Sequence, residues 1–305
     1  MLPLAGASCN AATDVRLPRN GDEAGLTGDA ACVGAPGGSI FANWPMPDPS
    51  TAGTDRSPTY DTTSTDVVVD RLTQLTWQRN LEPKSYLWSD ADAYCRCLAV
   101  GGHDDWRLPT RIELVSIVDF TKPSPAIDSN AFPGTPGDYF WTSSPLIGNS
   151  SAFWYVYFFD GNTHSTDASS SYRVRCVSGT PRAPPNRYTI AGDGSVLDTA
   201  TGLDWQQNPD TTARNWQDAK AYCAGLAPVD GRWRLPNMKE LQTLIDESKM
   251  DPAIDTSAFP GTAGQAFWTA SLLASTLPEA WFVNFYTGVS YTNAESNLYL
   301  VRCVR

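Results

Sequence analysis

The chain has 305 residues, a formal net charge of −11 and an apolar fraction of 41%. This apolar fraction is high enough for packed cores and excludes a disordered chain. Nucleic acids are held by clustered lysine and arginine side chains, and no run of either occurs here, so we expect no nucleic-acid partner. We also expect no transmembrane segment, because no apolar stretch approaches the roughly 20 residues that cross a bilayer.

Residues 1–59 are rich in glycine, proline, aspartate and threonine and show little periodicity, which predicts an irregular N-terminal extension. The first residues lack a basic start, but Ala5 and Ala7 are spaced like a signal-peptide cleavage site. Cys9 follows small residues, so it fits either a lipoprotein attachment site or a disulfide with Cys32. Both alternatives indicate a secreted, periplasmic or cell-surface protein.

An internal repeat organises the rest of the chain. The segments that recur in one register are Asp70 to Asn80 with Asp198 to Asn208, Trp106-Arg107-Leu108-Pro109 with Trp233-Arg234-Leu235-Pro236, Phe140-Trp141-Thr142 with Phe267-Trp268-Thr269, and Val174-Arg175-Cys176-Val177 with Val301-Arg302-Cys303-Val304. We therefore predict two modules of similar structure at residues 60–178 and 187–305. Residues 179–186 between them are rich in proline and predict a stiff linker.

The repeat also pairs the cysteines. Each module keeps one cysteine in its first predicted helix and one at its end, which predicts the disulfides Cys95–Cys176 and Cys223–Cys303. Cys97 has no counterpart in the second module; it is either a free thiol or paired with the extension or another chain. The seven cysteines lack the paired spacing of a metal cluster. Disulfides imply an oxidising compartment.

Within each module, local patterns predict a hairpin followed by two helices. Asp193-Gly194 is a preferred tight-turn pair, so residues 190–197 predict the hairpin. Apolar residues from Trp88 to Leu98 are spaced for one helical face, with Ser89 as the expected N-cap. A capping box at Thr110–Glu113, repeated in the second module, predicts where the second helix begins.

Short aromatic segments separated by polar loops follow the second helix. They predict strands at residues 140–142, 153–159 and 172–177. A hairpin, two helices and several antiparallel strands make each module α+β. The repeated tryptophans lie at strand and helix starts, so we interpret them as core residues rather than as platforms for sugar rings.

These motifs resemble a known family. The series Leu-Thr-x-Leu-x-Trp, Ala-x-x-Tyr-Cys, Trp-Arg-Leu-Pro, Phe-Trp-Thr-Ser-Ser and Val-Arg-Cys-Val is similar to the C-terminal domain family of the Legionella collagen-like adhesin. The segment Arg107 to Glu113 also resembles the formylglycine-generating-enzyme superfamily, a distant relative. The resemblance implies two tandem C-type-lectin-like modules, each with two helices and a short antiparallel sheet. It also implies attachment and sulfated-glycan binding, which the net charge of −11 disfavours.

Catalytic chemistry has little support in the sequence. The two histidines, His103 and His164, are isolated, so no Ser/His or Cys/His arrangement is evident. The copper–thiol chemistry of formylglycine-generating enzymes needs a reactive cysteine pair, whereas the repeated cysteines fit structural bridges. We expect a protein that is not an enzyme and keep a formylglycine-generating-type activity as the minor alternative.

We also expect no cofactor. Calcium, the usual ion of lectin-like folds, needs six to eight oxygen ligands, and the weak candidates for them are Asp104 and Asp105 on one loop. The duplicated Glu113 and Glu240 stand at predicted helix starts, so we interpret them as capping residues rather than as acid–base groups.

The polar loops before the last strand of each module differ between the modules while the framework repeats. Tyrosine, asparagine, serine and glycine dominate these loops, a composition that suits adaptable recognition. The predicted ligand contacts are Asp160, Asn162, Asp167, Tyr172, Asn284, Tyr286, Tyr291, Asn293, Asn297 and Tyr299. The alternative is that these loops are surface segments that tolerate substitution.

The sequence therefore favours an extracytoplasmic recognition or adhesion protein that binds a glycan or a surface protein through these loops. The alternative is a structural or assembly subunit of a cell-surface complex, with self-association through the modules or the extension.

Overall fold

The computed structural model describes residues 60–305 except for residues 123, 180–186, 228–232 and 276. The predicted extension, the Cys9–Cys32 pair and all of the predicted linker except Gly179 lie outside the described residues. The structure consists of 15 strands and four short helices in the described part of the chain.

In the first module the elements are β1 (Tyr60–Asp61), β2 (Val67–Asp70), β3 (Thr76–Gln78), α1 (Trp88–Arg96), α2 (Arg111–Ser116), β4 (Tyr139–Leu146), β5 (Asn149–Tyr157), β6 (Asn162–Asp167) and β7 (Val177–Ser178). In the second module they are β8 (Tyr188–Ile190), β9 (Ser195–Asp198), β10 (Asp204–Gln206), β11 (Asp210–Arg214), α3 (Trp216–Ala224), α4 (Met238–Gln242), β12 (Ala266–Leu272), β13 (Glu279–Asn284), β14 (Ser290–Ala294) and β15 (Tyr299–Val301).

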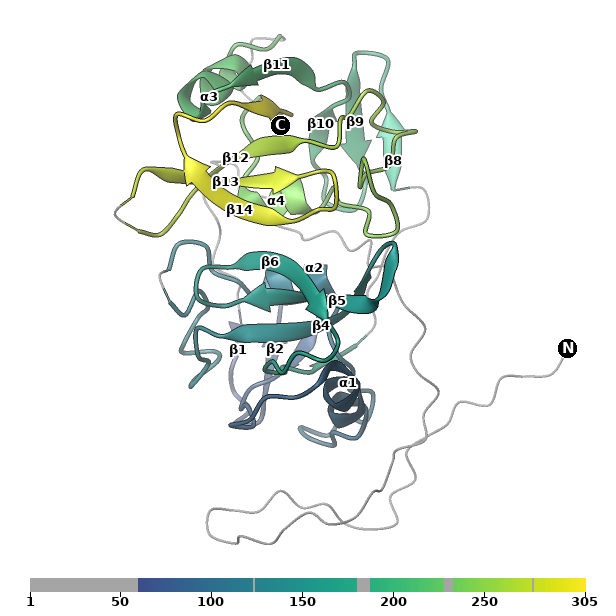
Figure 1. Cartoon of the computed structure of the whole chain (residues 1–305), viewed down its shortest axis with the longest axis vertical. Coiled ribbons are helices and arrows are strands. Elements are labelled where there is room, and N and C mark those ends of the chain that lie inside the picture. The colour runs from purple at the N-terminus through teal and green to yellow at the C-terminus, as the bar shows by residue number, and fades with distance from the viewer. Residues whose placement is uncertain (1–59, 123, 180–186, 228–232, 276) are drawn as a thin grey trace, which may run out of the picture.

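The strands form three sheets. A four-stranded sheet with the order β1-β2-β3-β7 belongs to the first module, and a three-stranded sheet with the order β10-β9-β8 belongs to the second. The third sheet has eight strands in the order β11-β15-β12-β13-β14-β6-β5-β4 and runs through both modules (Figure 1). Its neighbouring strands are antiparallel, except that β12 and β15 are parallel.

The two modules meet where β6 pairs with β14. Thr163 lies opposite Ser290, and their hydroxyl oxygens are 2.9 Å apart in a buried hydrogen bond. These two residues are 127 positions apart and are equivalent in the repeat. An antiparallel contact between equivalent residues is the geometry of a twofold-symmetric dimer. The chain therefore folds as a covalently linked pseudo-dimer whose twofold axis passes between Thr163 and Ser290.

The predicted fold class, α+β with two C-type-lectin-like modules that each own a short antiparallel sheet, is wrong. The structure is mostly β, because the four described helices have only five to nine residues and strands of both modules join in one large sheet. Apolar spacing located the helices but not their short length. The two sheet edges are joined by backbone hydrogen bonds, so the local hydrophobic pattern does not indicate that they pair.

Several local predictions are confirmed, and two are wrong. Residues 188–198 form the hairpin of β8 and β9, and both capping boxes are present. Helix α1, however, begins after Leu87 without a side-chain cap, so Ser89 is not its N-cap. Residues 172–177 are not a continuous strand, because Tyr172 and Arg173 make only isolated bridges, to Tyr86 and Phe140.

The two predicted disulfides are confirmed. Cys95–Cys176 and Cys223–Cys303 each connect the first helix of a module to its end, across sequence separations of 81 and 80 residues. Cys97 is not a free thiol in the structure.

One face of the eight-stranded sheet covers a core that the modules share. Helices α2 and α4 lie behind this sheet in Figure 1, and their apolar side chains join those of β4, β5 and β13 in a single buried cluster. The Phe120 ring packs edge-on against Trp281 of the other module, with ring centres 5.2 Å apart. Lys239 of α4 donates a hydrogen bond to the main-chain oxygen of Ser116 in the first module (3.0 Å).

A buried ion pair crosses the same junction. Arg111 donates from Nε to Glu247 Oε1 (2.6 Å) and from Nη1 to the Gly288 oxygen (2.7 Å), and both charged side chains are at most 1% exposed. The Arg111 guanidinium also lies 4.1 Å from the centre of the Trp154 ring. The repeat-equivalent positions hold Met238 and Phe120. The contact is therefore ionic on one side of the pseudo-twofold axis, and the equivalent side chains on the other are apolar.

We expect Arg111→Ala to lower the free energy of unfolding by about 3–5 kcal/mol, because it leaves the Glu247 carboxylate buried without its partner. The double variant Arg111→Met with Glu247→Phe copies the apolar residues of the equivalent positions, and we expect stability within about 1 kcal/mol of the parent or higher. Urea-induced unfolding followed by tryptophan fluorescence measures both. Equal losses in the single and double variants would contradict this assignment.

Candidate ligand-binding face

Strand β5 has aromatic side chains on both faces, in alternation. Successive side chains of a strand point to opposite sides, so Trp154 and Val156 are buried on the side of the shared core while Phe153, Tyr155 and Tyr157 lie on the other face. The core-facing residues are at most 2% exposed, whereas these three aromatic residues are partly exposed.

Neighbouring strands of the first module extend this row of rings. Residues directly opposite each other in an antiparallel pair share a face, and Tyr139 of β4 pairs with Tyr157 while His164 of β6 pairs with Tyr155. Ring centres are 4.3 Å apart for Tyr139–Tyr157, 5.2 Å for Tyr139–Tyr155 and 6.0 Å for Tyr155–His164. Tyr172 packs 5.0 Å from both Tyr139 and Tyr155.

The row continues across the module boundary without a gap. The His164 ring lies 5.8 Å from the Tyr291 ring of β14, which lies 6.1 Å from Phe282 of β13. Phe282 in turn lies 4.6 Å from Tyr299 of β15. We call this set the aromatic face; its members are Tyr139, Tyr155, Tyr157, His164, Tyr172, Phe282, Tyr291 and Tyr299. It is partly exposed throughout, except for Phe282 at 9%.

Among the described elements, helices cover this side of the sheet only near its two ends. Helix α1 packs with Trp141, Phe153 and Tyr172, and helix α3 packs with Trp268 and the second module's part of the face. In Figure 1 these two helices lie at opposite ends of the eight-stranded sheet, and β5, β6, β14 and β13 lie between them. The aromatic face is therefore a single surface between two helices.

Amide side chains at the second-module end are held in place. Asn293 Nδ2 donates to the Tyr299 hydroxyl (2.7 Å), and Asn297 Nδ2 donates to Asn293 Oδ1 (2.9 Å) and to the Ala294 oxygen (3.1 Å). Such bonds fix the rotamers of polar groups before a ligand arrives, which lowers the entropy cost of binding.

Burial raises the pKa of three tyrosines of the face. Burial, with smaller contributions from the neighbouring Tyr172, Tyr139 and Tyr291, raises the pKa of Tyr155 to about 12. Burial likewise raises the pKa of Tyr157 and Tyr291. At neutral pH these three hydroxyls are therefore uncharged and can both donate and accept hydrogen bonds.

The arginines beside the face are neutralised by aspartates. Arg173 Nε lies 3.2 Å from Asp138 Oδ2, and Arg214 Nη2 lies 2.6 Å from Asp210 Oδ2. Ligand groups that carry negative charge would compete with these carboxylates for the cations.

The structure brings seven of the ten predicted contact residues to this side of the sheet. Those on the face or bonded to it are Asn162, Tyr172, Asn284, Tyr291, Asn293, Asn297 and Tyr299. The other three lie at a strand end or in turns: Asp160, Asp167 and Tyr286. Among these, Asp160 accepts two hydrogen bonds from Asn162 (both 2.9 Å), and Tyr286 is 45% exposed in the turn after β13.

The contact residues predicted from the sequence do not include Tyr139, Tyr155, Tyr157, His164 and Phe282. A signal existed in the alternation of Phe153, Tyr155 and Tyr157, which predicts a strand with one aromatic face. No sequence pattern indicates that His164 belongs to the face, because its neighbours Tyr155 and Tyr291 come together only when the two modules pair.

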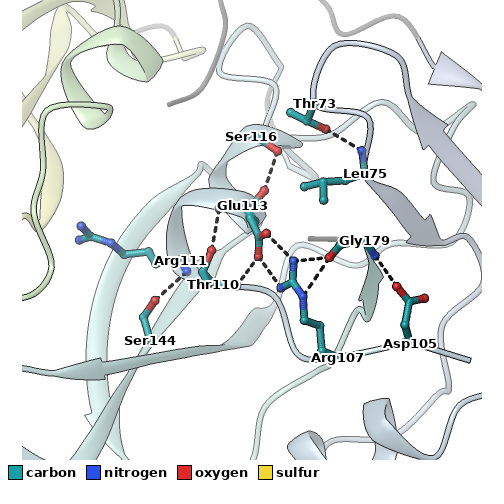
Figure 2. A network of polar contacts seen from close by, with 10 residues as sticks. All are labelled: Thr73, Leu75, Asp105, Arg107, Thr110, Arg111, Glu113, Ser116, Ser144 and Gly179. Atoms are coloured by element: carbon teal, nitrogen blue, oxygen red, sulfur yellow. Dashed lines mark hydrogen bonds and ion pairs between the residues drawn. The ribbon is translucent and has the colours of Figure 1, made fainter. Parts of the chain in front are cut away.

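The Trp-Arg-Leu-Pro segments serve the fold instead. Glu113 accepts hydrogen bonds from the Thr110 main-chain N–H (2.8 Å) and from both terminal nitrogens of Arg107 (2.7 and 2.6 Å) (Figure 2). Arg107 also donates to the Gly179 oxygen (2.8 Å), so the network ties α2 to the end of the module. Figure 2 shows Arg111 pointing away from this network.

The weak calcium candidates are not clustered with other acidic residues. Asp105 accepts from the Ser178 hydroxyl (2.5 Å) and the Gly179 N–H (3.1 Å), and the first of these bonds is the main cause of its lowered pKa. Asp104 is exposed. No group of three or more His, Cys, Asp or Glu residues in the described ranges is arranged to hold a metal ion. Within the same ranges, no helix has the length and apolarity to cross a membrane.

Comparison with known proteins gives one family. The model of the Lcl C-terminal domain matches the chain twice, at residues 66–178 and 194–305. No curated protein matches the chain.

The raised pKa values lead to a spectroscopic expectation. In a pH titration followed by phenolate absorbance, Tyr155 ionises near pH 12 in the folded chain and near pH 10 after unfolding, because burial disfavours the charged phenolate. Tyr155→Phe should remove one tyrosine from the late phase. A late phase of unchanged amplitude would contradict the burial of this hydroxyl.

Proposed function

Because the chain belongs to the Lcl C-terminal domain family, in two tandem copies, we propose that it is an extracytoplasmic recognition protein that binds a glycan through the aromatic face. The observation that carries the proposal is the continuous row of aromatic rings that crosses both modules, all of them at least partly exposed except Phe282. The two disulfides support a location in an oxidising compartment, and the family supports an adhesin-like role at the cell surface.

The chemistry of the face suits sugars. Tyrosine offers a rigid apolar ring for the C–H groups of a sugar and a hydroxyl for its oxygens, at low cost in conformational entropy. Most of these rings stand on paired strands of one sheet, so they are positioned before binding. A contact surface of this kind favours an adhesive role over a purely structural one.

Binding without catalysis is part of the proposal. All four repeated cysteines are joined in disulfides, so they are not available as the thiol pair that formylglycine-type chemistry requires.

We expect Tyr155→Ala to weaken glycan binding at least tenfold, about 1.4 kcal/mol, because it removes a ring that contacts Tyr139, Tyr172 and His164. The measurement is a glycan array with neutral and sulfated glycans, followed by titration of the best ligand. Tyr286→Ala is the matched control, since Tyr286 is exposed but outside the face. Thermal unfolding checks that both variants fold. Equal affinity in both variants would refute the proposal.

An assembly role is the second candidate, and a separate observation favours it. The loops that adjoin the ends of β13 and β14 expose Leu277 (58%) and Leu298 (61%). A hydrogen bond from the Glu295 N–H to the Pro278 oxygen (3.1 Å) connects the two loops. Neighbouring apolar tips of this kind suit contact with another protein surface.

If these tips mediate self-association, the molar mass in sedimentation should rise with protein concentration. The Leu277→Ser, Leu298→Ser double variant should abolish that rise, because it removes the apolar area that association would bury. A parent chain that stays monomeric over the whole concentration range would exclude this role.

A further inference from the structure

We infer that one linear, uncharged glycan lies across both modules, with His164 and Tyr291 beneath its middle. This inference rests on the proposed function and adds the ligand class, the stoichiometry and the path of the ligand. The joined sheet carries it, because the two halves of the aromatic face meet at the pseudo-twofold axis.

The two halves of the face are built from equivalent positions of the repeat. Residues of the first and second module that are 127 positions apart are His164 with Tyr291, Tyr155 with Phe282, Tyr172 with Tyr299, and Thr166 with Asn293. The pair nearest the axis, His164 and Tyr291, is in ring contact at 5.8 Å. Each module therefore supplies half of one site, and the two halves are in direct contact through these rings.

The junction holds these halves in a fixed relation. The Thr163–Ser290 hydrogen bonds, the buried Arg111–Glu247 pair and the shared core all connect the modules directly. A ligand that contacts both halves therefore does not have to order the two modules relative to each other. Once it is bound to one half, the other half is present at a high effective concentration.

The length of the face suits an oligosaccharide rather than a single sugar. From β4 through β5, β6 and β14 to β13 there are four inter-strand steps. Each step is about 4.8 Å, so the span is on the order of 19 Å. A pyranose unit in an extended chain is similar in length to one step, so the face accommodates on the order of four units.

The two ends of the face differ, which gives the ligand a direction. Tyr139 and Tyr157 extend the aromatic surface at the first-module end, where the equivalent positions of the second module hold Ala266 and Asn284. The second-module end instead presents the bonded amides of Asn293 and Asn297. A ligand with two chemically different ends would therefore bind in one orientation.

Charge selects an uncharged ligand. The flanking Arg173 and Arg214 are paired with Asp138 and Asp210. The hydroxyls of Tyr155 and Tyr157 are neutral at neutral pH, and the chain carries a formal charge of −11. A sulfated chain would meet net negative potential, whereas a neutral chain needs only hydroxyl partners.

The test is calorimetric titration of the full chain with linear β-1,4-linked oligomers of glucose and of N-acetylglucosamine, from the disaccharide to the hexasaccharide. We expect at least one series to gain tenfold or more in affinity from the shortest to the longest, with one hexasaccharide per chain. Sulfation of that hexasaccharide should weaken binding at least tenfold at low ionic strength, and added salt should reduce this difference.

The double variant His164→Ala, Tyr291→Ala should weaken hexasaccharide binding at least tenfold and leave disaccharide binding within twofold, because it alters only the junction. Tyr286→Ala is the control, and thermal unfolding verifies folding. Two ligands per chain, affinity independent of length, or no binding of either series would overturn the inference. The proposed function would survive those results if the array still showed Tyr155-dependent binding of another glycan, and it would fail if no glycan bound.

Discussion

The structure depends on the pairing of two sheet edges, β6 with β14. Each is the edge strand of its own module, and an unpaired edge exposes backbone groups that seek a partner. Here the partner is the equivalent strand of the other module, through Thr163 and Ser290. This single contact converts two small sheets into one of eight strands. It also brings α2 and α4 over a common core and joins two rows of rings into one surface.

Much of the structure within each module could be predicted from the sequence, but the pairing of the two modules could not. The repeat register located both disulfides, and the capping boxes located α2 and α4, because these features depend on residues close in sequence or equivalent in the repeat. The fold class was wrong because it depends on which edges pair. Backbone pairing between distant edges is specified by shape and burial on both partners, not by a local pattern.

The candidate site divides in the same way. Tyr172 and Tyr299 could be proposed from the composition of their loops, since loop residues often carry recognition. Tyr155 and Tyr157 could be found by applying strand periodicity to β5. His164 could not, because an isolated histidine gains its meaning from Tyr291, which lies in the other module. Site residues whose neighbours lie in the other module cannot be predicted from local sequence patterns.

The Arg111–Glu247 pair shows what covalent fusion makes available to a symmetric assembly. In a dimer of identical chains, every contact off the axis occurs twice, and a costly buried charge pair would have to occur twice as well. In this chain the ion pair occurs once, and the equivalent positions hold Met238 and Phe120. Substitutions can therefore alter the contact on one side of the pseudo-twofold axis and leave the equivalent contact on the other side unchanged. The pseudo-dimer can thus acquire a polarity that no homodimer of this module could encode.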